Sequence, residues 1–244
     1  MKLFLDNMIQ LKKNFILTII APFLVLIIGT FVFRHTNLDI TISKLFYVPE
    51  IGFLKKDSNP WLFLYHYGYF PGLLLAFGGL FLFGIGLFSK KIRRYRKIGL
   101  FLVLLMVIGP GLIVNSTFKN HWGRPRPREI VNFGGKRPFL TAWDKNKASD
   151  GHSFPSGHAS MGYYLLAPYF FLSRTEKKGG SFFFLFLGLG YGTLMGIGRI
   201  VQGAHFASDV LWSAGFVYFT GVGLYYLLRL DKDIWWRNKI SISD

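Results

Sequence analysis

Long apolar runs, each close to the length needed to cross a bilayer, dominate this chain of 244 residues, 51% of which are hydrophobic. A hydrocarbon core of about 30 Å takes about 20 apolar residues in a helix. Backbone that faces hydrocarbon must satisfy its own hydrogen bonds, so runs of this length predict helices. Six runs stand out, at residues 15–33, 63–88, 98–118, 158–173, 182–198 and 209–228. We therefore expect an all-α fold, a polytopic membrane protein whose six-transmembrane-helix bundle forms one domain over residues 1–244.

Residues 1–13 precede the first run and mix lysines with apolar side chains. Two interpretations stand for this segment: an interfacial helix lying on the membrane, or a cytoplasmic extension of the first span. The first run is longer than the apolar region of a typical cleavable signal, and no small-x-small cleavage site follows it. We therefore expect the first span to be retained.

The formal charge of +17 comes from 29 Lys and Arg residues against 12 Asp and Glu residues. Nucleic acid is a common partner for such an excess. Here the cations lie between apolar runs, where anionic lipid headgroups and membrane topology explain them better. We expect the lipid bilayer as a partner and no nucleic acid. The chain has no cysteine, which excludes disulfides and thiolate zinc sites.

Two short basic loops predict the orientation in the membrane. Residues 90–97 hold six cations and no anion, and residues 174–178 are also net basic. Lysine and arginine in short loops mark the cytoplasmic side, so both loops and both chain ends are expected there. The segments 34–62, 119–157 and 199–208 then face outward. The 119–157 loop is itself basic, and we attribute its cations to a binding site.

Three segments far apart in the sequence carry residues suited to one phosphate group. Lys119 ends the third run, Arg126 stands between two prolines, and Arg199 follows the fifth run. Arginine offers phosphate a planar fork and lysine a mobile point charge. We predict that these three residues bind phosphate, with Arg124 as an accessory donor. Taken alone, the arginines at 124, 126 and 128 would fit interfacial cations better.

The second segment, Pro155-Ser156-Gly157-His158, opens the fourth predicted span. The amino end of a helix offers unpaired N–H groups and a positive dipole to an anion. We predict that Ser156 and the Gly157 amide bind phosphate, because glycine lets the backbone approach closely. His158 at the mouth of the site is predicted to be a general acid. Helix capping is the alternative role of this segment.

The third segment places His205 four residues before Asp209. If the sixth span begins nearby, this spacing puts both on one helix face. A carboxylate that holds one imidazole N–H leaves the other nitrogen free to attack phosphorus. We predict His205 as the nucleophile and Asp209 as its orienting partner. A metal site is the rival interpretation, but without a His-x-x-x-His pair or a dense carboxylate cluster we expect neither a metal nor a cofactor.

Together the three segments resemble the motifs of the type 2 phosphatidic acid phosphatase superfamily, over predicted spans three to six. The resemblance implies a six-helix membrane core, a phosphohistidine intermediate and no metal requirement. It also implies the same roles for the residues already named, which are Lys119, Arg126, Ser156, Gly157, His158, Arg199, His205 and Asp209. One departure is Gly198, which stands where the third motif usually has serine.

The stretch from Trp122 to Arg128 and the residues just before Pro155 look like a bacterial branch that includes lipid A 1-phosphatases. The expected function is hydrolysis of a phosphate monoester or pyrophosphate on a membrane lipid, with lipid A 1-phosphate as one candidate. The expected location is the bacterial inner membrane, with the active site facing the periplasm or exterior. A lipid-linked phosphotransferase, a phosphatidylglycerophosphate phosphatase and an undecaprenyl pyrophosphate phosphatase remain alternatives. A protein that binds or transports phosphate without chemistry would not need both histidines and the aspartate.

Overall fold

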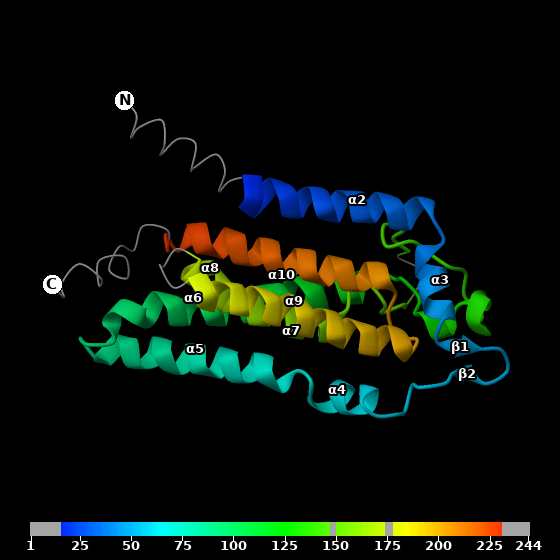
Figure 1. Ribbon diagram of the computed structural model, residues 1–244, viewed down its shortest axis with the longest axis horizontal. Coiled ribbons are helices and arrows are strands. Elements are labelled where there is room, and N and C mark those ends of the chain that lie inside the picture. The colour runs from blue at the N-terminus through cyan, green and yellow to red at the C-terminus, as the bar shows by residue number, and fades with distance from the viewer. Residues whose placement is uncertain (1–15, 147–149, 174–177, 231–244) are drawn as a thin grey trace.

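The computed structural model describes residues 16–146, 150–173 and 178–230 (Figure 1). The interfacial helix predicted at residues 1–13 and most of the basic loop at 174–178 lie outside these residues. The described part of the chain is mostly helical, and its long helices run side by side along the long axis (Figure 1).

Five helices in the described residues are long and apolar enough to cross a membrane, and each coincides with a predicted span. The first joins a short π-helical turn, η1 (Ile16–Ile20), to α2 (Ala21–His35). The others are built from α4 (Trp61–Tyr67) with α5 (Phe70–Phe88), from η2 (Arg93–Tyr95) with α6 (Arg96–Met106) and η3 (Val107–Lys119), from α9 (Lys178–Val201), and from α10 (Ala207–Leu227).

The fourth predicted span, 158–173, is a shorter helical segment that lies inside the bundle. It consists of α7 (Gly157–Tyr163), η6 (Tyr164–Leu166) and α8 (Ala167–Leu172) in direct succession. Most of its side chains are buried, among them Ala159, Tyr164, Leu166 and Phe170. Because this segment is shorter than the roughly 20 residues that a bilayer requires, the count of six spans stays a prediction.

Glycines on α9 allow this inner segment to pack closely. Gly188, Gly192 and Gly196 recur every four residues, and a Cβ atom on them would meet Leu166, Tyr163 and Val210 respectively. Small residues let helix backbones approach in a membrane, where packing is the main force between helices. These glycines form a small-residue face on α9. It fixes α9 against α7 and η6, which share the centre of the bundle.

The connecting segments at one end of the bundle form a folded cap. It contains α3 (Leu38–Lys44), the strands β1 (Tyr47–Val48) and β2 (Gly52–Phe53), and the short helices η4 (Pro127–Glu129) and η5 (Val131–Phe133). The two strands pair antiparallel, so the fold is not purely α-helical. Buried aromatic and aliphatic side chains hold the cap onto the turn between α9 and α10, namely Phe53, Ile130, Phe133 and Phe206.

All three predicted motifs lie at the capped end. The end of η3, the start of α7 and the turn from α9 to α10 meet there, whereas the turn between α5 and α6 lies at the opposite end (Figure 1). That opposite turn carries the six cations of residues 90–97. The helices therefore separate the basic loop from the candidate site by the full length of the bundle.

Candidate active site

His205 lies in the turn between α9 and α10. Gly203 in this turn has a φ of +61°, and a Cβ atom there would meet the ring of Phe53, so glycine is required. Helix α10 begins only at Ala207. The prediction that His205 and Asp209 share one helix face is therefore wrong, because His205 precedes the helix and Asp209 lies in its first turn.

The imidazole of His205 is almost fully buried and held in one tautomer. Its Nδ1 lies 2.6 Å from the carbonyl oxygen of Ser153. A carbonyl can only accept, so Nδ1 carries the proton and Nε2 keeps its lone pair. Burial lowers the pKa of His205 to about 3, and the charges of Lys119 and Arg199 act in the same direction against Asp209. The ring is thus neutral at pH 7, which is the form a nucleophile needs.

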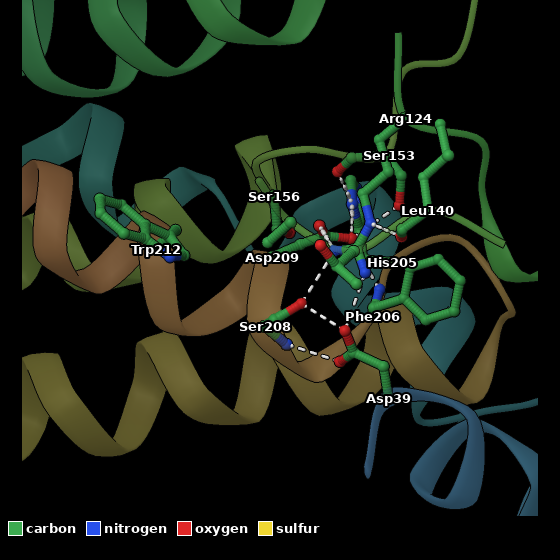
Figure 2. Close-up of polar contacts among 12 residues, drawn as sticks. Asp39, Arg124, Leu140, Ser153, Ser156, His205, Phe206, Ser208, Asp209 and Trp212 are labelled. Atoms are coloured by element: carbon green, nitrogen blue, oxygen red, sulfur yellow. Dashed lines mark hydrogen bonds and ion pairs between the residues drawn. The ribbon is translucent and has the colours of Figure 1, made fainter. Parts of the chain in front are cut away.

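Asp209 holds the His205 turn without bonding the imidazole closely. One carboxylate oxygen accepts from the Ser153 hydroxyl at 2.6 Å and from the Phe206 amide at 2.7 Å. The same oxygen is 3.7 Å from Nδ1 of His205, which is too long for a hydrogen bond. The predicted pairing is therefore indirect. Ser153 orients the ring through its carbonyl, and Asp209 fixes Ser153 (Figure 2).

Arg124 belongs to the buried hydrogen-bond network around Asp209. The prediction that Arg124 is an accessory phosphate donor is therefore corrected. Its guanidinium is fully buried and donates to the Leu140 carbonyl at 2.9 Å, to the Ser208 hydroxyl at 2.8 Å and to Asp209 at 2.5 Å (Figure 2). A further donor reaches Asp39 at 2.8 Å. Proximity to these two carboxylates raises the pKa of Arg124 despite its burial. With its donors engaged, Arg124 supports the site rather than the ligand.

The three other predicted cations gather at the mouth of the site. Lys119 ends η3, and its Nζ lies 3.3 Å from the position that a Cβ atom on Gly157 would take. Arg126 and Arg199 each have a buried Nε that finds no hydrogen-bond partner among the residues the structure describes. Across the described residues, none of these three cations forms an ion pair with a carboxylate. Such uncompensated donors suit an anion.

Arg126 is placed by its own backbone. Its amide donates to the Glu129 carboxylate at 3.0 Å, and the amide of Arg128 donates to the Gly203 carbonyl at 3.1 Å. These bonds fasten the proline-flanked segment to the His205 turn. Burial lowers the pKa of Arg126, and the nearby charge of Arg128 adds to this. Its guanidinium is therefore poorly compensated by the protein alone.

His158 and Arg199 share a contact with Tyr65, a residue that the motifs did not identify. The rings of Tyr65 and His158 stack with centroids 5.0 Å apart, and the Arg199 guanidinium lies 4.5 Å from the centre of the Tyr65 ring. Nε2 of His158 lies 3.2 Å from the Tyr65 carbonyl. Because that carbonyl can only accept a hydrogen bond, Nε2 of His158 carries a proton, and Nδ1 is the nitrogen left for proton transfer.

Ser156 and Gly157 open the inner helical segment, as predicted from their sequence. The Ser156 side chain caps α7 by accepting from the Ala159 amide at 3.4 Å. The capping alternative is therefore realised, and the hydroxyl proton remains available for another acceptor. Gly198, the departure from the third motif, faces Trp61, whose ring lies 3.3 Å from the position of a Cβ atom. A serine there would direct its side chain toward that indole.

Gly157→Ala should lower kcat/KM by about 10²-fold, because a misplacement near 1 Å at a reacting centre can cost that much. The added methyl group would lie 2.4 Å from Oδ1 of Asn115 and would push on Lys119. Steady-state kinetics of purified protein would measure the effect. Gly190→Ala on α9 is the matched control, since its Cβ atom meets open space. Equal activity in the two variants would contradict a role for Gly157 in the site.

Within the part of the chain that the structure describes, no group of three or more His, Asp or Glu side chains could hold a metal ion. Metal independence stays a prediction. Four residues of the site were missed by the sequence interpretation: Asp39, Tyr65, Ser153 and Ser208. Ser153 had a signal, since it lies just before the second motif. Asp39 and Tyr65 come from the first predicted outward segment and from the start of the second span, where no motif marked them.

The comparisons with known proteins agree with this geometry. The sequence profile of the PAP2 superfamily matches residues 70–232. A lipid A 4'-phosphatase of Francisella tularensis subsp. novicida is 36% identical over 201 residues, which are 81% of this chain and 89% of that enzyme. A lipid A 4'-phosphatase of Rhizobium leguminosarum is 32% identical over 120 residues, 48% of this chain and 50% of that enzyme. No solved structure matches the chain.

The predicted superfamily is thus confirmed, whereas these relatives are named as 4'-phosphatases and not as the 1-phosphatases of the expected branch. The family match covers four of the six predicted spans in full, most of the second span, and every predicted motif. Because the family profile matches most of the chain and the Francisella enzyme is similar along most of its length, this chain belongs to the PAP2 superfamily and is a phosphatase.

Proposed function

We propose that this phosphatase hydrolyses the 4'-phosphate of lipid A through a phosphohistidine at His205. The observation that supports this substrate is the 36% identity to the Francisella lipid A 4'-phosphatase across 89% of that enzyme. The site supports the chemistry, because three cations without carboxylate partners among the described residues lie beside a neutral imidazole. The 4'-phosphate of lipid A thus replaces the 1-phosphate, which the sequence motifs had suggested, as the proposed group that is removed.

Each residue then has a defined part in the reaction. Lys119, Arg126 and Arg199 neutralise the phosphate oxygens, with the Ser156 hydroxyl and the Gly157 amide as further donors. Nε2 of His205 attacks phosphorus while the bond to the lipid oxygen breaks. His158, which must first be protonated at Nδ1 as well as at Nε2, delivers the Nδ1 proton to that oxygen. A water molecule, deprotonated by His158, then cleaves the P–N bond and releases inorganic phosphate.

The proposed location is the inner membrane of a bacterium, with the site on its periplasmic face. This orientation is supported by the six cations of residues 90–97, which lie at the end of the bundle opposite the site. Clustered Lys and Arg in a short loop favour the cytoplasmic side. Cysteine substitution at Asp57 and at Lys91, followed by labelling with a membrane-impermeant thiol reagent, tests it. Labelling of position 91 in intact spheroplasts would reverse the assignment.

The proposed substrate can be tested with lipid A that carries phosphate at both positions. The purified enzyme is incubated with it in detergent, in the presence and absence of a chelator. We expect mass spectrometry to show loss of the 4'-phosphate only, free phosphate in equal amount, and the same rate with chelator. Loss of the 1-phosphate would contradict the assigned position. Faster turnover of phosphatidylglycerophosphate or undecaprenyl pyrophosphate would contradict the assigned lipid.

Phosphoryl transfer to a second lipid uses the same intermediate and is distinguished by product. Lipid A labelled at the 4'-phosphate should release labelled inorganic phosphate when a mixed lipid extract is added. A labelled lipid product other than the substrate would show that the acceptor is not water.

A further inference from the structure

We propose that Asp39 is a positioning residue for the nucleophile: through Arg124 it fixes the turn that carries His205. This inference rests on the proposed role of His205. Asp39 lies on α3, outside residues 70–232 that match the family profile. None of the three motifs includes it, yet its side chain is buried and its carboxylate reaches the active-site network (Figure 2).

The first step of the argument is the way in which Arg124 is held. Its guanidinium has three anchors in three different segments: the Asp39 carboxylate at 2.8 Å, the Leu140 carbonyl at 2.9 Å and the Asp209 carboxylate at 2.5 Å. A planar guanidinium bonded on three sides has no freedom to rotate. Asp39 supplies the one anchor that comes from α3.

The second step is the charge of the network. Arg124 and both carboxylates are essentially inaccessible to solvent. An unpaired buried charge is costly, whereas opposite charges with satisfied hydrogen bonds are tolerated. One arginine here serves two carboxylates, so removing Asp39 leaves Arg124 free to shift toward Asp209.

The third step is that Ser208 bonds both Asp39 and Arg124. Its amide donates to Asp39 at 3.0 Å and its hydroxyl to the same carboxylate at 2.5 Å. The hydroxyl also accepts from Arg124 at 2.8 Å. Helix α3 is thereby bonded to the first turn of α10, in which Asp209 lies.

The last step connects Arg124 to the imidazole. The guanidinium carbon lies 4.3 Å from the centre of the Phe206 ring, which is the residue after His205. The Phe206 amide donates to Asp209, and Asp209 holds Ser153, whose carbonyl orients His205. A shift of Arg124 therefore reaches the nucleophile by two routes. Neither route passes through the cations that bind phosphate.

The proposal predicts a separation between chemistry and phosphate binding. Asp39→Asn keeps the size of the side chain but turns an N–H donor toward Arg124. We expect kcat on lipid A to fall about ten- to hundredfold, as for loss of a hydrogen bond to a charged group, with KM changed less than about twofold. Calorimetry with two inorganic probes should agree. Orthovanadate bonds to a nucleophile in a trigonal bipyramid, so its affinity for Asp39→Asn should be at least about tenfold lower than for the unaltered enzyme. The affinity for phosphate should be the same in both proteins.

Two further variants make the test decisive. Ser208→Ala removes the hydroxyl that bonds both Asp39 and Arg124, without changing any charge. We expect kcat to fall about three- to tenfold while KM and phosphate binding stay nearly unchanged. This variant carries the test if Asp39→Asn does not fold. Asp57→Asn removes an exposed carboxylate of the same outward segment and should leave every parameter unchanged. Equal weakening of phosphate and vanadate, or no change in kcat, would overturn the proposal. Because the two calorimetric probes need no lipid, their result is independent of whether lipid A is the substrate.

Discussion

His205→Gln should reduce kcat by about 10⁴-fold or more, the scale seen when a nucleophile or its base is removed from a catalytic set. Glutamine can still donate to the Ser153 carbonyl from its amide, so the buried hydrogen bond of His205 is kept. What is lost is a nitrogen lone pair aimed at phosphorus. The measurement is single-turnover hydrolysis of labelled substrate, with a thermal melt to verify folding.

The covalent intermediate offers a second measurement of the same prediction. A rapid quench at alkaline pH should trap labelled phosphate on the unaltered protein and none on His205→Gln. His121→Gln is the matched control, because His121 is exposed and its Nδ1 lies 2.8 Å from the Thr117 carbonyl of its own helix end. Turnover by His205→Gln within tenfold of the unaltered enzyme would show that this imidazole is not the nucleophile.

The membrane spans and the cations of the site could be predicted because each leaves a local signal. A run of apolar residues needs no partner to be recognised as a span. Lys119 and Arg199 lie at the ends of such runs, and Arg126 stands between two prolines in the loop that follows one. The inner segment 157–172 carries the same apolar signal. Most of its residues are buried against protein, and hydropathy does not distinguish a protein environment from a lipid one.

The support of the nucleophile could not be predicted, since it depends on contacts between distant segments. Arg124 and Arg126 stand in similar sequence surroundings. In the fold, Arg124 is bonded within a buried network, whereas the Nε of Arg126 has no hydrogen-bond partner among the described residues. Asp39 and Ser208 meet only because α3 folds back onto α10. The four-residue spacing of His205 and Asp209 predicted a shared helix face, and the helix begins between them. Only the tertiary structure shows which of these residues contact one another.

Arg126→Lys should lower kcat/KM by about 10²- to 10³-fold, although the positive charge is retained. The backbone of Arg126 is fixed by its bond to Glu129, so a lysine side chain would start from the same place. Its single ammonium group cannot supply two parallel N–H donors to a phosphate, and bidentate geometry gives arginine its advantage. The loss should fall mainly on kcat if the second donor strengthens as charge develops on the transferring group. Initial rates over a range of lipid concentrations would separate the two parameters.

Arg128→Lys is the matched control for this substitution. Arg128 lies two residues further along, inside η4, which Arg126 precedes; its side chain is exposed, and its link to the His205 turn is made by the backbone amide. A change from arginine to lysine there keeps both the charge and that backbone bond, so kinetics close to those of the unaltered enzyme are expected. If Arg126→Lys were equally active, charge alone would account for phosphate binding at this position. The planar fork of Arg126 would then have no part in the reaction.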